Sequence, residues 1–262
     1  MKIRSYAFIG ASLFLMLATA CNSDKAADDR KSENKSLEFE TYSFSRVAEQ
    51  SGGESVDLPG ARYLHVVGQG VLPVKLGDND IAQLRDSLLS MARVEFPSSG
   101  DAAPMIDKDW KLTNLADSVQ ACNEQYNYLS IVLNTPAIIV WQAYVGEYNC
   151  GAAHGMYANM YLNYSMRSGR ILSLKDLMKP GYEKALTSIL VEKLSSIDSI
   201  QATPSEIGIP SQWYVTPTGM TFVYGVYEIA PYSSGEIEVP VYLYEIEELL
   251  TPEGLSLLSP TA

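Results

Sequence analysis

Histidine is scarce in this chain: only two of its 262 residues are histidines. A metal site built mainly from imidazole ligands therefore cannot be assembled. The catalytic signatures G-x-S-x-G and H-E-x-x-H and the Walker-type glycine loop are absent as well. We therefore predict no metal site, no cofactor and no catalytic residue.

Basic residues are in the minority, with 19 Lys and Arg against 31 Asp and Glu and a formal net charge of −12. An acidic chain repels phosphate backbones, so we expect no nucleic-acid partner. The same charge attracts basic proteins.

Long apolar runs are absent except near the N-terminus, where residues 6–17 follow Lys2 and Arg4. This run is too short to span a membrane comfortably and is typical of a secretory signal. Small residues then lead into Cys21, and the stretch resembles a bacterial lipobox. The resemblance implies a signal peptide over 1–20 and diacylglycerol on the sulfur of Cys21. The alternative is an ordinary signal peptide followed by a chance cysteine.

Residues 21–36 are polar, charged and free of aromatic residues. Such a segment cannot bury enough surface to offset its ordering entropy, so we expect a flexible tether. Its acidic cluster resembles the surface-export signals of Bacteroidetes lipoproteins; a solvated linker facing the periplasm is the alternative. We expect a lipid-anchored protein of the cell envelope, on the periplasmic or the surface face of the outer membrane.

Two cysteines remain after Cys21, namely Cys122 and Cys150. An even pair in an exported protein predicts a disulfide. Two free, buried thiols are the alternative.

Alternating apolar and polar residues predict strands over 37–49 and 61–73, the second with a bend at Gly68 and Gly70. Helical spacing predicts a helix over 78–96 that starts at Asp78 to Asp80. The region 114–126 is ambiguous and is compatible with a short helix.

The second half of the chain is richer in strand patterns. We expect two strands within 128–148, one over 156–166, and about three more between 213 and 250, with Pro240 at an edge position or at a strand start. A helix over 179–197 has Leu186, Ile189, Leu190 and Leu194 on its inner stripe. Ser173 and Asp176 have capping-box spacing.

These elements predict an α+β fold with antiparallel sheets and two main helices packed on one side. We divide the folded part into an N-terminal α+β subdomain over 37–120 and a C-terminal α+β domain over 121–262.

The loop 149–155 contains Cys150 and His154 four positions apart. A thiolate–imidazolium pair would make a nucleophile and could begin a zinc site, but both uses lack further groups and conflict with a disulfide. Gly151 and Gly155 permit backbone angles closed to other residues. We therefore interpret the loop as a turn shaped by these glycines and fastened by His154, with direct ligand contact by His154 as the alternative.

The strand that follows presents Tyr157, Asn159, Tyr161 and Asn163 on one face. Tyrosine and amide side chains provide contact area and hydrogen bonds, as binding interfaces prefer. We predict a recognition surface there; the alternative is that a helix covers this face.

Two stretches carry a family resemblance. "GAAHGMYANMYLNYSMRSGRILSLKDLM" and "FVYGVYEIAPYSSGEIEVPVYLYEIEELL" resemble the conserved motifs of the RsiV-like C-terminal domain family, over about 128–250. The preceding region is similar in layout to the PdaC/RsiV-type N-terminal region. The resemblance implies an extracytoplasmic α+β domain, and RsiV itself binds lysozyme. It does not carry over the signalling role, because no sigma-binding segment is present.

We therefore expect a non-enzymatic envelope lipoprotein that binds a lysozyme-like protein or peptidoglycan or another glycan. An envelope hydrolase with His154 in its site is the alternative. A third alternative is an assembly lipoprotein whose sheet edge pairs with a partner.

Overall fold

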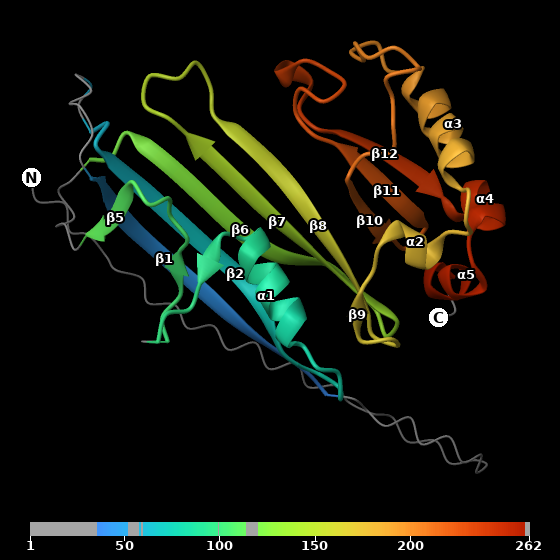
Figure 1. Ribbon diagram of the computed structural model, residues 1–262, viewed down its shortest axis with the longest axis horizontal. Helices are drawn as coiled ribbons and strands as arrows, with labels where there is room; N and C mark the ends of the chain where they lie inside the picture. The colour runs from blue at the N-terminus through green and yellow to red at the C-terminus, as the bar shows by residue number, and fades with distance from the viewer. Residues whose placement is uncertain (1–35, 52–57, 59, 99, 114–119, 260–262) are drawn as a thin grey trace, which may run out of the picture. The chain divides into compact units, whose positions relative to one another are not determined.

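The computed structural model describes residues 36–51, 58, 60–98, 100–113 and 120–259 (Figure 1). The predicted signal peptide, Cys21 and most of the predicted tether therefore lie outside the described residues. Two larger sheets, a two-stranded sheet and several helices give the α+β fold predicted from the sequence. Among the described residues, no helix is both long enough and apolar enough to cross a bilayer.

A seven-stranded sheet forms the larger part, with strand order β5-β1-β2-β6-β7-β8-β9. Its long strands are β1 (Leu37–Gln50), β2 (Tyr63–Leu76), β6 (Asn123–Asn134), β7 (Ile138–Tyr148) and β8 (Met156–Ser165). The short edge strands are β5 (Trp110–Thr113) and β9 (Arg170–Ile171). All neighbours are antiparallel except β2 and β6, which run parallel.

A parallel pair needs a crossover connection, and here it contains α1 (Ala82–Met91) and the small hairpin of β3 (Val94–Glu95) and β4 (Ala103–Pro104). Helix α1 starts later than predicted. Its N-cap is Ile81, and the Asp80 carboxylate accepts a bond from the Ala82 N–H at 3.0 Å. The last part of the region 114–126 is not helical, because strand β6 begins at Asn123.

One face of the large sheet packs under α1. Leu84 and Leu88 of the helix meet a buried cluster that includes Leu129, Trp141 and Leu162. Strand β2 continues through Gly68 and Gly70, where a bend was predicted. Their role is to leave space, since a Cβ at Gly68 would lie 2.2 Å from the Phe44 ring.

The C-terminal part has its own core around a three-stranded antiparallel sheet of β10 (Gln212–Thr216), β11 (Gly219–Tyr224) and β12 (Ile237–Tyr242). Helix α3 (Glu183–Leu194) buries Leu186, Leu190 and Leu194 against this core, while Ile189 is only partly buried. Each sheet thus carries its main helix on one face. Pro240 lies on the edge strand β12, as predicted.

Short helices complete the C-terminal core: α2 (Leu174–Leu177), η1 (Tyr232–Ser234), α4 (Leu243–Ile246), η2 (Glu247–Leu249) and α5 (Pro252–Leu258). The predicted capping box is confirmed at α2. Both Oγ and the backbone N–H of Ser173 donate to the Asp176 carboxylate, at 2.6 and 2.8 Å.

The two sheets meet where β8 lies beside β10 (Figure 1). Side chains rather than paired strands make this junction. The Asn163 amide donates to the Trp213 carbonyl at 3.1 Å and accepts from the Val215 N–H at 2.9 Å. In return, the Gln212 side-chain oxygen accepts from the Tyr161 N–H at 2.9 Å. These bonds satisfy strand-edge groups that would otherwise be unpaired.

Candidate functional site: a tyrosine strip on the open sheet face

The structure contains the predicted disulfide between Cys122 and Cys150. It ties the start of β6 to the loop that follows β7. The buried Asn123 adds to this tie: its side-chain oxygen accepts from the Cys150 N–H at 2.9 Å, and its amide donates to the Ala61 and Tyr63 carbonyls. A thiolate at Cys150 is therefore not available as a nucleophile beside His154 or as a zinc ligand.

His154 lies in this loop and contacts the segment between β11 and β12. Its Nδ1 lies 2.9 Å from the Gly155 carbonyl and its Nε2 lies 3.2 Å from the Tyr227 hydroxyl. Its ring stacks on Tyr232 with centroids 3.9 Å apart, and the Tyr232 hydroxyl donates to the Gly155 carbonyl at 2.6 Å. The imidazole thus joins two loops that are distant in sequence.

The two glycines of the loop have different structural requirements. Gly151 has a φ of +82°, which other residues adopt only with strain. A Cβ at Gly155 would lie 2.8 Å from the Glu147 carbonyl oxygen, so this position needs glycine for space.

An aromatic row crosses the face of the large sheet opposite α1. We call it the tyrosine strip: Tyr126, Tyr128, Tyr144, Tyr157 and Tyr232. Its central rings come from three neighbouring strands, with centroids 5.9 Å apart from Tyr128 to Tyr144 and again from Tyr144 to Tyr157, at interplanar angles of 19° and 21°. The strip follows from the strand period of two, which puts these residues on one face.

A line of polar side chains runs beside the strip. The Gln142 amide donates to the Asn159 side-chain oxygen at 2.8 Å. Glu236 accepts from both the backbone N–H and the side-chain amide of Asn159, at 2.8 and 2.6 Å. An aromatic row and a row of amides and carboxylates therefore lie side by side on one half-buried face.

The predicted row from Tyr157 to Asn163 is only partly accessible. Tyr157 and Asn159 belong to the strip and its polar line, but Tyr161 stacks on Tyr214 at 4.3 Å. Asn163 is 2% exposed and bonded to β10, so it is a junction residue, and its prediction as a binding residue is wrong. Strand β10 covers this end, where a covering helix was the alternative.

The other end of the strip reaches the N-terminal half of the chain. Ser45 Oγ lies 2.7 Å from His65 Nε2, and His65 is in register with Glu124 of β6. The Tyr126 hydroxyl donates to Glu124 at 2.5 Å. His65 is not among the site residues predicted from the sequence. The only signal for it is the alternation in β2, which places His65 on the same face as Tyr63 and Val67.

Electrostatics along the strip reflect its carboxylates. The hydrogen bond to Glu124 and partial burial raise the pKa of Tyr126 to about 12. Burial, followed by the nearby Tyr157, Tyr232, Tyr128 and Glu236, raises the pKa of Tyr144. The hydroxyls of Tyr126 and Tyr144 therefore carry their proton at neutral pH.

One residue of the strip's outer end is strained. Tyr227 has a φ of +67°, in the left-handed region, and is 56% exposed. A bulky residue there costs free energy and persists only where surrounding structure imposes it, often at functional sites. Tyr227 leans over the stacked His154 and Tyr232 at 38–40° to both rings.

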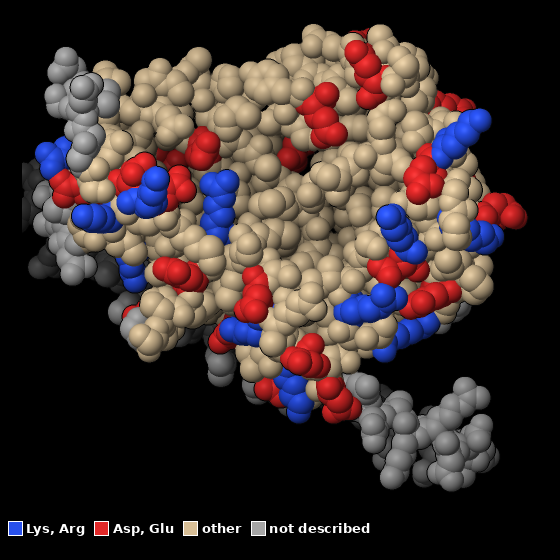
Figure 2. All heavy atoms as spheres, viewed as in Figure 1, with Lys and Arg blue, Asp and Glu red and all other residues tan. Residues whose placement is uncertain are grey.

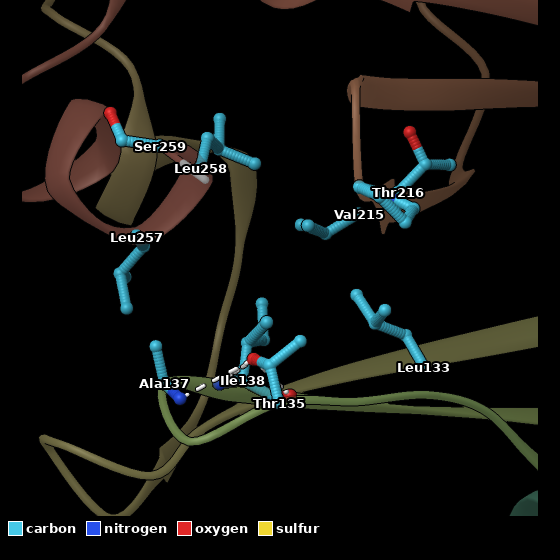
Figure 3. Close-up of a pocket in the computed structure, with 10 residues that line it drawn as sticks. Leu133, Thr135, Ala137, Ile138, Val215, Thr216, Leu257, Leu258 and Ser259 are labelled. Atoms are coloured by element: carbon cyan, nitrogen blue, oxygen red, sulfur yellow. Dashed lines mark hydrogen bonds between the residues drawn. The ribbon is translucent and has the colours of Figure 1, made fainter. Parts of the chain in front are cut away.

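A separate cavity of about 210 Å³ lies between the β6–β7 hairpin, β10 and α5 (Figure 3). Leu133, Ile138, Val215, Leu257 and Leu258 make it mainly apolar. Thr135 uses its hydroxyl within the hairpin, and Ser259 donates to the Leu255 carbonyl. Because ligand sites need polar groups that orient the ligand, we assign none to this cavity.

The described residues contain no group of three or more His, Cys, Asp or Glu side chains placed to hold a metal ion. On the face that Figure 2 presents, basic side chains are interspersed with acidic ones on the left and at the lower right, and the middle of the face carries few charges.

Comparison with known proteins points to one family. Residues 175–243 match the family described as "Protein of unknown function (DUF3298)". The fold resembles a DUF3298 family member from Bacteroides fragilis, at 20% identity and a TM-score of 0.55, over 84% of this chain and 95% of that one. It also resembles a DUF3298 family protein from Pseudomonas aeruginosa, at 18% identity and a TM-score of 0.54, over 83% and 96%. No curated protein matches. The chain therefore shares the fold of DUF3298 family proteins and carries their sequence motif over 175–243.

Proposed function

We propose that this protein is a cell-envelope lipoprotein whose folded part is a non-enzymatic glycan-binding domain. The tyrosine strip carries this proposal. Sugar rings present C–H groups that pack on aromatic rings and hydroxyls that bond to amides and carboxylates. The strip and the polar line of Gln142, Asn159 and Glu236 supply both kinds of group side by side.

The strip fits a linear chain that crosses the strands. All of its tyrosines except Tyr232, which lies in η1, come from β6, β7 and β8, and these strands neighbour one another at about 4.8 Å per strand. Because the central rings are nearly parallel, successive sugars can meet successive rings. The peptidoglycan glycan strand is the ligand that an extracytoplasmic anchor on Cys21 would bring within reach.

A lysozyme-like basic protein is the second candidate. The net charge of −12 and the resemblance to the RsiV-like family favour it. Tyrosine-rich faces are also common in protein interfaces.

A hydrolase centred on His154 has less support. Both ring nitrogens of His154 face groups of the chain, Gly155 and Tyr227, and neither is an acid. General acid–base catalysis by His154 would need one of these nitrogens within reach of the reacting group.

The test measures binding of the full chain to a chitin oligosaccharide of about six sugars, long enough to cross the strip. Tyr144→Ala removes the central ring, and we expect about tenfold weaker binding. Tyr244→Ala is the matched control, because Tyr244 is 73% exposed and belongs to neither the strip nor its polar line.

Capture of hen lysozyme at low and at moderate salt forms the second arm. Lysozyme binding without oligosaccharide binding would replace the glycan proposal by the protein one. Binding of neither would contradict a binding role for the strip.

A further inference from the structure

The strip is acidic at both ends. Glu124 lies at the β6 end and Glu236 at the other, and neither forms an ion pair with a basic residue among the described ones. The cation–π contacts of the described part of the chain are Arg62 over Tyr63 and Lys193 over Tyr242, both outside the strip. A ligand on this face therefore meets two carboxylates that form no ion pair with a basic side chain of the described residues.

The two carboxylates differ in what they can still bind. Both oxygens of Glu236 accept bonds from Asn159, so this carboxylate is held in place by the chain. Glu124 uses Oε2 for the Tyr126 hydroxyl, and its Oε1 has no hydrogen-bond partner within the described structure. Glu124 thus has one oxygen bonded to Tyr126 and a second oxygen that can accept a hydrogen bond from a ligand.

The surroundings of Glu124 are polar and lie on the same open face. His65 is in register with it on β2, and Ser45 on β1 meets the His65 ring at 2.7 Å. Val67 and Tyr126 are the next register pair on this face of β2 and β6, and the strip begins at Tyr126. A group bound at Glu124 would therefore belong to the same ligand that covers the tyrosines.

We propose that the strip selects glycans that carry free amino groups, with a sugar ammonium seated on Glu124 beside Tyr126. This inference rests on the proposed glycan-binding function and names its substrate class. An ammonium can donate to Glu124 Oε1 in a charge-assisted hydrogen bond, which is stronger than a neutral one. An N-acetyl group can offer Glu124 only a neutral amide N–H and forms no ion pair, and a uronic acid is repelled by both carboxylates.

The experiment compares three oligosaccharides of equal length with the full chain at about pH 6, where most free amines of the probe are protonated. They are a chitosan oligomer, a chitin oligomer and an oligogalacturonate. We expect chitosan to bind about tenfold more tightly than chitin, and galacturonate more weakly than both.

Glu124→Gln keeps the shape of the side chain and removes its charge. It should bring the affinities for chitosan and chitin together. Glu253→Gln is the matched control, because it removes the same charge from an exposed position on α5, away from the strip. That variant should keep the full preference for chitosan at about 0.15 M salt, where distant charges are screened.

The outcomes separate the inference from the function on which it rests. Equal binding of chitosan and chitin, or tightest binding of galacturonate, overturns the inference and leaves a glycan-binding strip. An equal loss of preference in Glu124→Gln and Glu253→Gln assigns the preference to net charge and also overturns it. No binding of any probe overturns the proposed function itself.

Discussion

The imidazole of His154 lies against the ring of Tyr232, with centroids 3.9 Å apart and planes at 21°. This contact joins the loop before β8 to the segment between β11 and β12, so it closes the outer end of the tyrosine strip. The glycines, the disulfide and the junction between the sheets all hold this arrangement. Each can be tested separately.

Gly155→Ala tests the loop that carries His154. The added Cβ would lie 2.8 Å from the Glu147 carbonyl oxygen, so the backbone must shift and the stack on Tyr232 must loosen. We expect a loss of at least about 1 kcal/mol in the free energy of unfolding, from urea titration. Gly208→Ala is the control, since no atom lies within 4 Å of its new Cβ, and it should change stability by less than about 0.5 kcal/mol. Equal effects of the two variants would refute a steric role of Gly155.

Removal of the disulfide should lower stability through the unfolded state. Cys122 and Cys150 are 28 positions apart, and opening such a loop costs about 3–4 kcal/mol in the chain-entropy model. The double variant Cys122→Ser/Cys150→Ser should show this loss in chemical denaturation. Wild-type protein treated with reductant should match it, and a reductant that leaves the unfolding midpoint unchanged would contradict the prediction.

Asn163→Ala should weaken the junction between the sheets. The substitution leaves the Trp213 carbonyl and the Val215 N–H without their partner in a buried place. An unsatisfied buried group costs about 1–3 kcal/mol, so we expect a loss of about 2–4 kcal/mol for the pair. Asn134→Ala, at an exposed position on β6, serves as control in the same unfolding experiment. A loss below about 0.5 kcal/mol at Asn163 would show that water replaces these bonds.

The capping box at α2 should make stability depend on pH. Bonds from Ser173 and the nearby Arg170 lower the pKa of Asp176 below its ordinary value. A lowered folded-state pKa stabilises the protein above the unfolded-state pKa, and this contribution disappears as pH falls through the folded-state value. Asp176→Asn should therefore cost about 1 kcal/mol at neutral pH and progressively less below about pH 4, in thermal or urea unfolding. A pH-independent difference would mean that the charge of Asp176 does not contribute.

Much of the local structure could be predicted because its causes are local. Leu186, Leu190 and Leu194 recur at helical spacing, and they line the buried side of α3. The Ser173 and Asp176 pair, the edge position of Pro240 and the disulfide also follow from residue type and spacing. The binding character of His154, Tyr157 and Asn159 remains a prediction.

Errors arose where long-range contacts decided the outcome. Gly68 and Gly70 did not bend β2, because Phe44 and Tyr42 from the neighbouring strand occupy the space that their missing side chains leave. Asn163 shared its face with Tyr157, but β10 comes from about 50 residues further along the chain and covers it. No periodicity within β8 carries that information.

The sequence alone determined the α+β class, the alternation that puts tyrosines on one side of each strand, and the cysteine pair. It could do so because the period of a helix or a strand, and the residue types that favour a turn, depend only on residues close together in the sequence. Only the tertiary structure decided that Tyr126, Tyr144, Tyr157 and Tyr232 form one strip and that Glu124 lies beside His65. These neighbours come from separate strands, and strand order and register depend on the packing of the whole sheet.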